Sequence, residues 1–122
     1  MESRIRPSLA KEYSDYAVVG DDIAGGSMSE WSINSSDMIA EYSFDIAVFK
    51  KYRGRDLVGV NLINEAIKGY ELNRSMYEEM GYDTIMRLWV VNPRLVKFLE
   101  KNKDFEIESQ YSDGSAHMTY MN

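Results

Sequence analysis

The sequence predicts an α/β domain (an α+β mixed sheet) with a βαβ crossover in its middle. The main observation is the run from residue 38 to 91, where a strand, a basic glycine-containing loop, a long amphipathic helix and a second strand follow one another. Alternating segments linked by turns at both ends of the chain indicate antiparallel hairpins. Parallel strands joined by a helix leave a crevice at their C-terminal ends. We therefore expect the strands ending at Val48 and Val91 to be parallel and splayed there.

The N-terminal third predicts an arm followed by a hairpin. Residues 1–14 are polar and form the expected arm, either loose or a short edge strand, and residues 15–122 form the single domain. Residues 15–20 and 27–33 have the composition of strands. Residues 21–26 between them contain two aspartates and two glycines, so the turn of the hairpin is expected there.

The middle of the chain predicts the longest strand and the longest helix. Residues 38–49 form the strand. One face of it carries Tyr42, Phe44, Ile46 and Val48, and the other carries Glu41, Ser43, Asp45 and Ala47. An apolar stripe at helical spacing then runs from Asp56 to about Met80. Asp56 is the predicted N-cap of this helix, and Gly81 is its predicted C′ residue.

The last third predicts a strand, a short helix and a closing hairpin. Residues 84–91 form a buried strand, and Pro93 suits the first position of a helix because its missing N–H is not needed there. Residues 105–111 and 115–121 alternate and flank a Ser-Asp-Gly turn. The predicted order is therefore three strands, a helix, a strand, a helix and two strands.

Composition excludes several classes of function. The chain has 122 residues, a formal net charge of −6, no cysteine and one histidine, His117. Thiolate zinc sites, cysteine nucleophiles and multi-histidine sites are therefore excluded, and we expect no metal. An acidic chain with one short basic run is a poor binder of nucleic acid. No apolar run reaches about 18 residues and no secretory signal is evident, so we expect a cytoplasmic protein without a membrane partner.

The loop after the longest strand predicts an anion site. Residues 48–59 run from the strand end into the helix and include Arg53, Gly54 and Arg55. Free backbone N–H groups and a partial positive charge gather where a helix begins, and arginines add charge that suits a phosphate or pyrophosphate. The alternative is an ordinary loop whose arginines are solvated, and these residues alone leave both readings open.

The same stretch resembles a known family. Residues 46–63, IAVFKKYRGRDLVGVNLI, are similar to the signature segment of the GNAT acetyltransferases, in which a loop of pattern Q/R-x-x-G-x-G/A opens a long helix. The final third is similar too, because a strand leads to Asn92, a helix ending in FLEKNKDF and a last hairpin. The resemblance implies a GNAT-like acyl-CoA N-acyltransferase fold. It also implies acetyl transfer from acetyl-CoA to an amine acceptor, a small molecule or a protein, and it leaves room for a homodimer.

The resemblance implies that the strand end, the loop and Asn92 hold acetyl-CoA. The implied residues are Ile46, Ala47, Val48, Arg53, Gly54, Arg55, Asp56, Leu57, Val58, Gly59 and Asn92. Asp56 departs from the pattern because it stands where the first glycine belongs, and Val58 replaces the following Gly/Ala. As an N-cap, Asp56 would occupy the N–H groups that the pyrophosphate needs and would repel it by about 4 kcal/mol at ~4 Å. In the alternative, Asp56 points to solvent and the arginines outweigh it.

The catalytic groups of the family are matched in part. The tyrosine that protonates the departing thiolate falls at Leu99, with Phe98 beside it, and neither can donate a proton. A general base could come from the longest strand, where Glu41, Tyr42 and Asp45 are the candidates. Glu41 is equally well explained as an ordinary solvent-facing strand residue.

Other candidates lie in the closing hairpin. Tyr111 is a candidate to border the acceptor site, and His117 is expected at the surface. Asp104 replaces the glycine of the family's G-F pair. Two functions therefore stay open: an acetyl-CoA-dependent N-acetyltransferase, or a catalytically degenerate GNAT-fold binding or assembly protein such as those of tailed phages.

Overall fold

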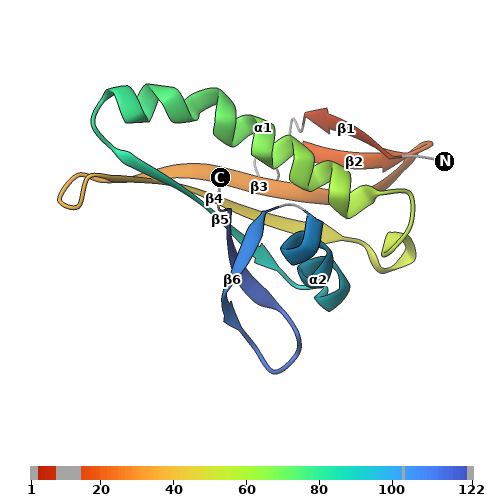
Figure 1. Ribbon diagram of the computed structural model, residues 1–122. Coiled ribbons are helices and arrows are strands. Elements are labelled where there is room, and N and C mark those ends of the chain that lie inside the picture. The colour runs from red at the N-terminus through yellow and green to blue at the C-terminus, as the bar shows by residue number, and fades with distance from the viewer. Residues whose placement is uncertain (1–2, 8–14, 103, 121–122) are drawn as a thin grey trace.

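The chain folds into one mixed sheet with both helices on the same side. The computed structural model describes residues 3–7, 15–102 and 104–120. The strands are β1 (Arg4–Pro7), β2 (Asp15–Val19), β3 (Asp22–Asn34), β4 (Ile39–Val48), β5 (Asp83–Val90), β6 (Phe105–Gln110) and β7 (Ala116–Tyr120). The helices are α1 (Val58–Glu79), α2 (Pro93–Asn102) and the short 3-10 turn η1 (Lys50–Tyr52). Figure 1 shows α1 lying along the sheet and α2 near the closing hairpin.

The expected parallel pair is present at the centre of the sheet. The strand order is β1-β2-β3-β4-β5-β7-β6, and β4 pairs with β5 in parallel while the other neighbouring strands pair antiparallel. Pairing of β4 with β5 ends at Asp45 and Trp89, although β4 continues to Val48. The two strands therefore separate at their C-terminal ends, which confirms the splayed crossover predicted from the sequence.

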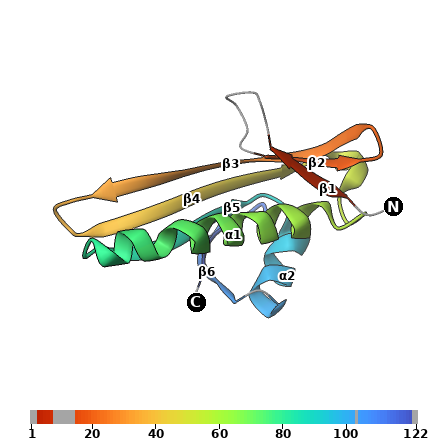
Figure 2. The same cartoon turned by 90° about the horizontal axis from the view of Figure 1, so that it is seen from above.

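The two faces of the sheet have opposite character. Tyr42, Phe44 and Ile46 point toward the helices and are buried in one hydrophobic cluster with residues of both α1 and α2. Figure 2 shows the two helices beneath the same face of the sheet. The opposite face carries Glu41 and Asp45 of β4, and no described helix covers it. Within the described residues, neither helix is long and apolar enough to cross a membrane.

The first hairpin differs from the prediction. Its turn is formed by Gly20, with φ of 61°, and Asp21, whereas Gly25 and Gly26 belong to β3. A side chain at Gly25 would place its Cβ 2.5 Å from the carbonyl oxygen of Ala47 and 3.2 Å from a methyl group of Val58. This glycine thus serves close packing within the sheet and not a turn. The edge strand β1 is one of the two arrangements expected for the arm, and residues 8–14 lie outside the described part.

The start of α1 also differs from the prediction. The helix begins at Val58, and its N-cap is Leu57, which has φ of 56° and offers no side-chain hydrogen bond. Asp56 comes before the cap with φ of 54°, so it is not the N-cap. The C-terminal end agrees with the prediction: Gly81 has φ of 93° and donates its N–H to the carbonyl oxygen of Glu78 at 3.0 Å.

Gly25→Ala should destabilise the fold. Because the new methyl group would meet backbone atoms, which cannot move away as a side chain can, we expect a loss of about 1–3 kcal/mol in the free energy of unfolding measured in urea. Ser32→Ala, an exposed substitution on the same strand, should change that free energy by less than about 0.5 kcal/mol. Equal effects of the two substitutions would show that β3 can shift away from β4.

Candidate functional site

Two neighbouring hollows lie where β4 and β5 separate. A hollow of about 100 Å³ lies between the strand ends, and a second of about 270 Å³ lies beside the start of α1. Both hollows are lined by Val48, Asn92 and Leu95, so they lie side by side, and we call the two together the strand-end groove. Strand separation and the helix start thus contribute to the same site.

The strand-end groove brings together the residues that the resemblance implied. Each of Ile46, Ala47, Val48, Arg53, Gly54, Arg55, Asp56, Leu57, Val58, Gly59 and Asn92 lines one or both hollows. Sequence reasoning missed a wall supplied by α2, formed by Arg94, Leu95 and Phe98. The spacing of four residues between Arg94 and Phe98 places them on one helix face, and this signal could have found them.

The first backbone N–H groups of α1 belong to residues that line the groove. The first hydrogen bond of the helical ladder runs from the N–H of Asn61 to the carbonyl oxygen of Leu57 at 2.8 Å. The N–H of Val58 instead donates to the carbonyl oxygen of Arg55 at 3.3 Å, which lies outside that ladder. The N–H groups of Gly59 and Val60 therefore precede the ladder, and both residues line the groove. Such donors, together with the helix dipole, favour an anion.

Three arginines and one aspartate set the charge of the groove. Arg53 donates from Nε to the carbonyl oxygen of Val48 at 3.1 Å, which fixes its guanidinium beside the strand end. The Nε of Arg55 lies 4.0 Å from a carboxylate oxygen of Asp56. With Arg94, the arginines outnumber Asp56 by two charges, so the groove is positive within an acidic protein.

The two residues that depart from the family pattern lie differently from the prediction. The side chain of Asp56 is only 15% exposed and faces Arg55, so it neither caps α1 nor points to solvent. Val58 is 1% exposed and packs in the core near Gly25, so its bulk does not fill the groove. Gly59 allows α1 and α2 to pack closely, because a Cβ there would lie 3.2 Å from a methyl group of Leu95.

The buried side chain of Tyr52 holds the loop before α1. Tyr52 is buried, and its hydroxyl donates to a carboxylate oxygen of Asp22 at 2.7 Å, while Lys51 lies 3.5 Å from the same oxygen. The hydrogen bond from Tyr52 and the nearby Lys51 lower the pKa of Asp22. The carboxylate in turn raises the pKa of Tyr52. The loop is thus anchored to the first residue of β3.

Helix α2 offers the groove no proton donor at the position where the family places its tyrosine. Leu99 is fully buried in the core, and Phe98 lines the groove instead. Asn92 has a structural role, because its side-chain oxygen accepts the N–H of Arg94 at 3.0 Å and so caps α2. Asp104, in place of the family's glycine, has φ of 59°, a conformation that glycine favours.

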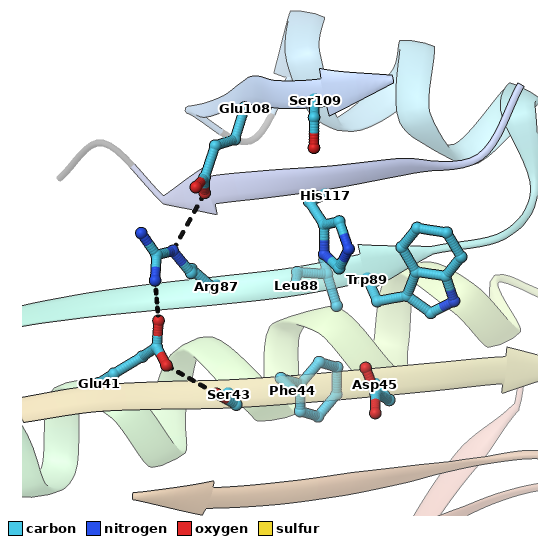
Figure 3. A pocket seen from close by; sticks show the side chains of 10 residues that line it. All are labelled: Glu41, Ser43, Phe44, Asp45, Arg87, Leu88, Trp89, Glu108, Ser109 and His117. Carbon is cyan, nitrogen blue, oxygen red and sulfur yellow. Dashed lines mark hydrogen bonds and ion pairs between the residues drawn. The ribbon is translucent and has the colours of Figure 1, made fainter. Parts of the chain in front are cut away.

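A second cavity of about 360 Å³, the open-face cavity, lies on the uncovered side of the sheet (Figure 3). It is lined by Glu41, Ser43, Phe44, Asp45, Arg87, Leu88, Trp89, Glu108, Ser109 and His117. Arg87 stands between Glu41, with which it forms a short ion pair, and Glu108, whose carboxylate accepts from Nε at 3.0 Å. This pairing raises the pKa of Arg87, with the hydrogen bond to Glu41 as the main cause.

The candidate catalytic residues do not form one cluster. Glu41 lies in the open-face cavity, whereas Tyr42 is 7% exposed on the opposite, helix-covered face, where burial raises its pKa. Tyr111 is outside the cavity lining but its ring lies 5.4 Å from that of Trp89. His117, expected at the surface, lines the cavity, with its ring 4.6 Å from the same indole.

Comparison with known proteins identifies the fold. No family model matches the sequence, and no curated protein does. Arabidopsis thaliana Naa50, solved in complex with a bisubstrate analogue CoA-Ac-MVNAL, is similar to 88% of this chain with a TM-score of 0.59 and 18% identity, over 71% of its own length. An acetyltransferase of the GNAT family from Streptococcus pneumoniae is similar to 86% of the chain with a TM-score of 0.54 and 21% identity, over 63% of its length. The chain has the GNAT fold, as its sequence predicted.

The anchoring of the loop can be tested through Asp22. Tyr52→Phe removes the hydroxyl donor, so the pKa of Asp22, which lies below its ordinary value of about 3.9, should rise toward it. Because this pKa is lowered on folding, its stabilising contribution is present at neutral pH and is lost as the pH falls through the folded-state pKa. NMR titration of the Asp22 carboxyl carbon measures the change. Tyr82→Phe should leave that titration unaltered, and an unaltered titration in Tyr52→Phe would refute the anchor.

Proposed function

We propose that the protein is an N-acyltransferase that binds acetyl-CoA in the strand-end groove and acetylates an amine. The observation that carries the proposal is the coincidence, in one groove, of a strand separation, two helix N–H donors and three arginines. The GNAT fold is consistent with it, and the Naa50 complex shows that a protein of this fold takes a ligand containing CoA.

The groove residues divide into two groups by chemistry. A pyrophosphate would be held by the N–H groups of Gly59 and Val60 and by the arginines. The smaller hollow includes Ile46, Val48 and Val90 in its lining, and these apolar side chains suit an extended, weakly polar chain. Acetyl-CoA supplies an activated acyl group, so a C–N bond to the amine forms as the C–S bond breaks; the amine loses a proton and the thiolate gains one.

The open-face cavity provides the acceptor side of this proposal. Asp45 and Trp89 are the last paired residues of β4 and β5, and both line the open-face cavity. The next residues along each strand, Ile46 and Val90, line the strand-end groove. An acyl group brought through the separation would therefore reach an amine in the cavity, and positioning would supply much of the rate.

A binding protein without catalysis is the second candidate. Phe98 and Leu95 occupy the α2 wall of the groove, where a hydroxyl could have protonated the leaving thiolate. The carboxylate of Glu41 is also already paired with Arg87. A groove that binds coenzyme A without acetyl transfer would fit this candidate.

Coenzyme A binding measured by calorimetry tests the groove. Removing one charge-assisted contact costs about 1.5–3 kcal/mol, so Arg94→Gln should weaken binding by at least tenfold. Lys97→Gln removes the same charge from the same helix at an exposed position outside the groove lining and should leave the affinity unchanged. Equal affinities for wild type and Arg94→Gln, or no binding by the wild type, would refute the groove as the site.

Release of free thiol from acetyl-CoA tests transfer itself. Most amine acceptors are protonated at neutral pH, with pKa values around 10, and the groove offers no tyrosine on α2 as an acid. We expect kcat/KM to rise by up to about tenfold per pH unit between roughly pH 7 and 9 as the acceptor loses its proton. A rate that falls over this range in a protein that stays folded would contradict the mechanism, and binding with no thiol release would favour the second candidate.

A further inference from the structure

We propose that the acceptor bound in the open-face cavity is a linear aliphatic polyamine, that is, a primary amine carrying at least one further positive charge. The proposal rests on the acyltransferase function proposed above and specifies its second substrate. It is drawn from the charge of the cavity, its aromatic wall and its position relative to the strand separation.

The cavity carries excess negative charge. Glu41, Asp45 and Glu108 line it together with one cation, Arg87, so the lining has two more negative than positive charges when His117 is neutral. Arg87 is engaged by both glutamates. Asp45 makes no hydrogen bond or ion pair with another residue of the described chain, so its carboxylate is available to a ligand.

An aromatic wall stands beside this carboxylate. Trp89 lies opposite Asp45 in the sheet, and its ring is tilted by 44° against that of His117, with the ring centroids 4.6 Å apart. Figure 3 shows the indole, the imidazole and the carboxylate of Asp45 around the same end of the cavity. An alkylammonium group is attracted both to a carboxylate and to the face of an indole, by about 0.5–2 kcal/mol for the latter. This end therefore suits an aliphatic amine.

The length of the cavity favours an acceptor with two separated amino groups. Asp45 adjoins the strand separation, and Glu41 lies four residues earlier on β4, roughly 13 Å away along an extended strand. A nitrogen near Asp45 would be next to the separation, while a second ammonium group could reach the cluster of Glu41, Arg87 and Glu108, which carries one net negative charge. A volume of about 360 Å³ lies in the range of small-molecule sites, which favours a free polyamine over a peptide segment.

Spermidine binding to the full chain without any CoA compound tests this inference. Calorimetry should show that spermidine binds at least tenfold more tightly than butylamine, which has one amino group. Asp45→Asn, which keeps the shape of the side chain, should weaken spermidine binding by at least tenfold. Glu106→Gln changes the net charge equally at an exposed position of β6 outside the cavity and should have no effect. Circular dichroism spectra establish that each variant is folded.

Each outcome decides the proposal. Equal binding of spermidine and butylamine, or equal weakening by Asp45→Asn and Glu106→Gln, would overturn it. Should Asp45→Asn fail to fold, Glu108→Gln provides the second variant, and unchanged binding in that variant would overturn it. Tighter binding of a blocked lysine tripeptide than of spermidine would also overturn it, in favour of a peptide acceptor. Because coenzyme A binding is measured separately, a functional groove without polyamine binding refutes this inference alone, and polyamine binding without coenzyme A binding refutes the proposed acetyl transfer.

Discussion

The point at which β4 and β5 stop pairing is the constraint on which the rest of the structure depends. The start of α1 and the side of α2 line the space that opens beside the separated strand ends. Gly59 permits this because its missing side chain lets Leu95 approach. The same separation leaves the ends of β4 and β5 accessible, and the strand-end groove forms there.

Much of the fold could be predicted because periodicity and turn residues are local signals. The alternation of β4 and the apolar stripe of α1 placed both elements within about two residues of their observed bounds. Gly25 misled the prediction because the same residue type serves turns and close packing, and the contact that requires it, with Ala47 of the neighbouring strand, is not visible from local sequence. The prediction of Asp56 as the N-cap was wrong because this residue adopts a left-handed backbone conformation within the loop.

The candidate site was predictable on the groove side and less so on the acceptor side. The groove residues are nearly contiguous in sequence, so one loop pattern identified most of them, while Arg94 and Phe98 required knowledge of how α2 packs. The open-face cavity joins β4, β5, β6 and β7, which are distant along the chain. Glu41 and Tyr42 illustrate the limit: they are adjacent in sequence, yet strand alternation sends them to opposite faces.

The strand order also has a consequence for how the chain is made. The first four strands pair antiparallel in chain order, but the free edge of β4 is covered only after the 22 residues of α1 have been synthesised and β5 has crossed over. Until then, a nascent chain exposes a long, half-apolar strand edge, which is a template for pairing with other chains. The interval between the synthesis of β4 and that of β5 is therefore the stage at which the nascent chain is most prone to pair with other chains.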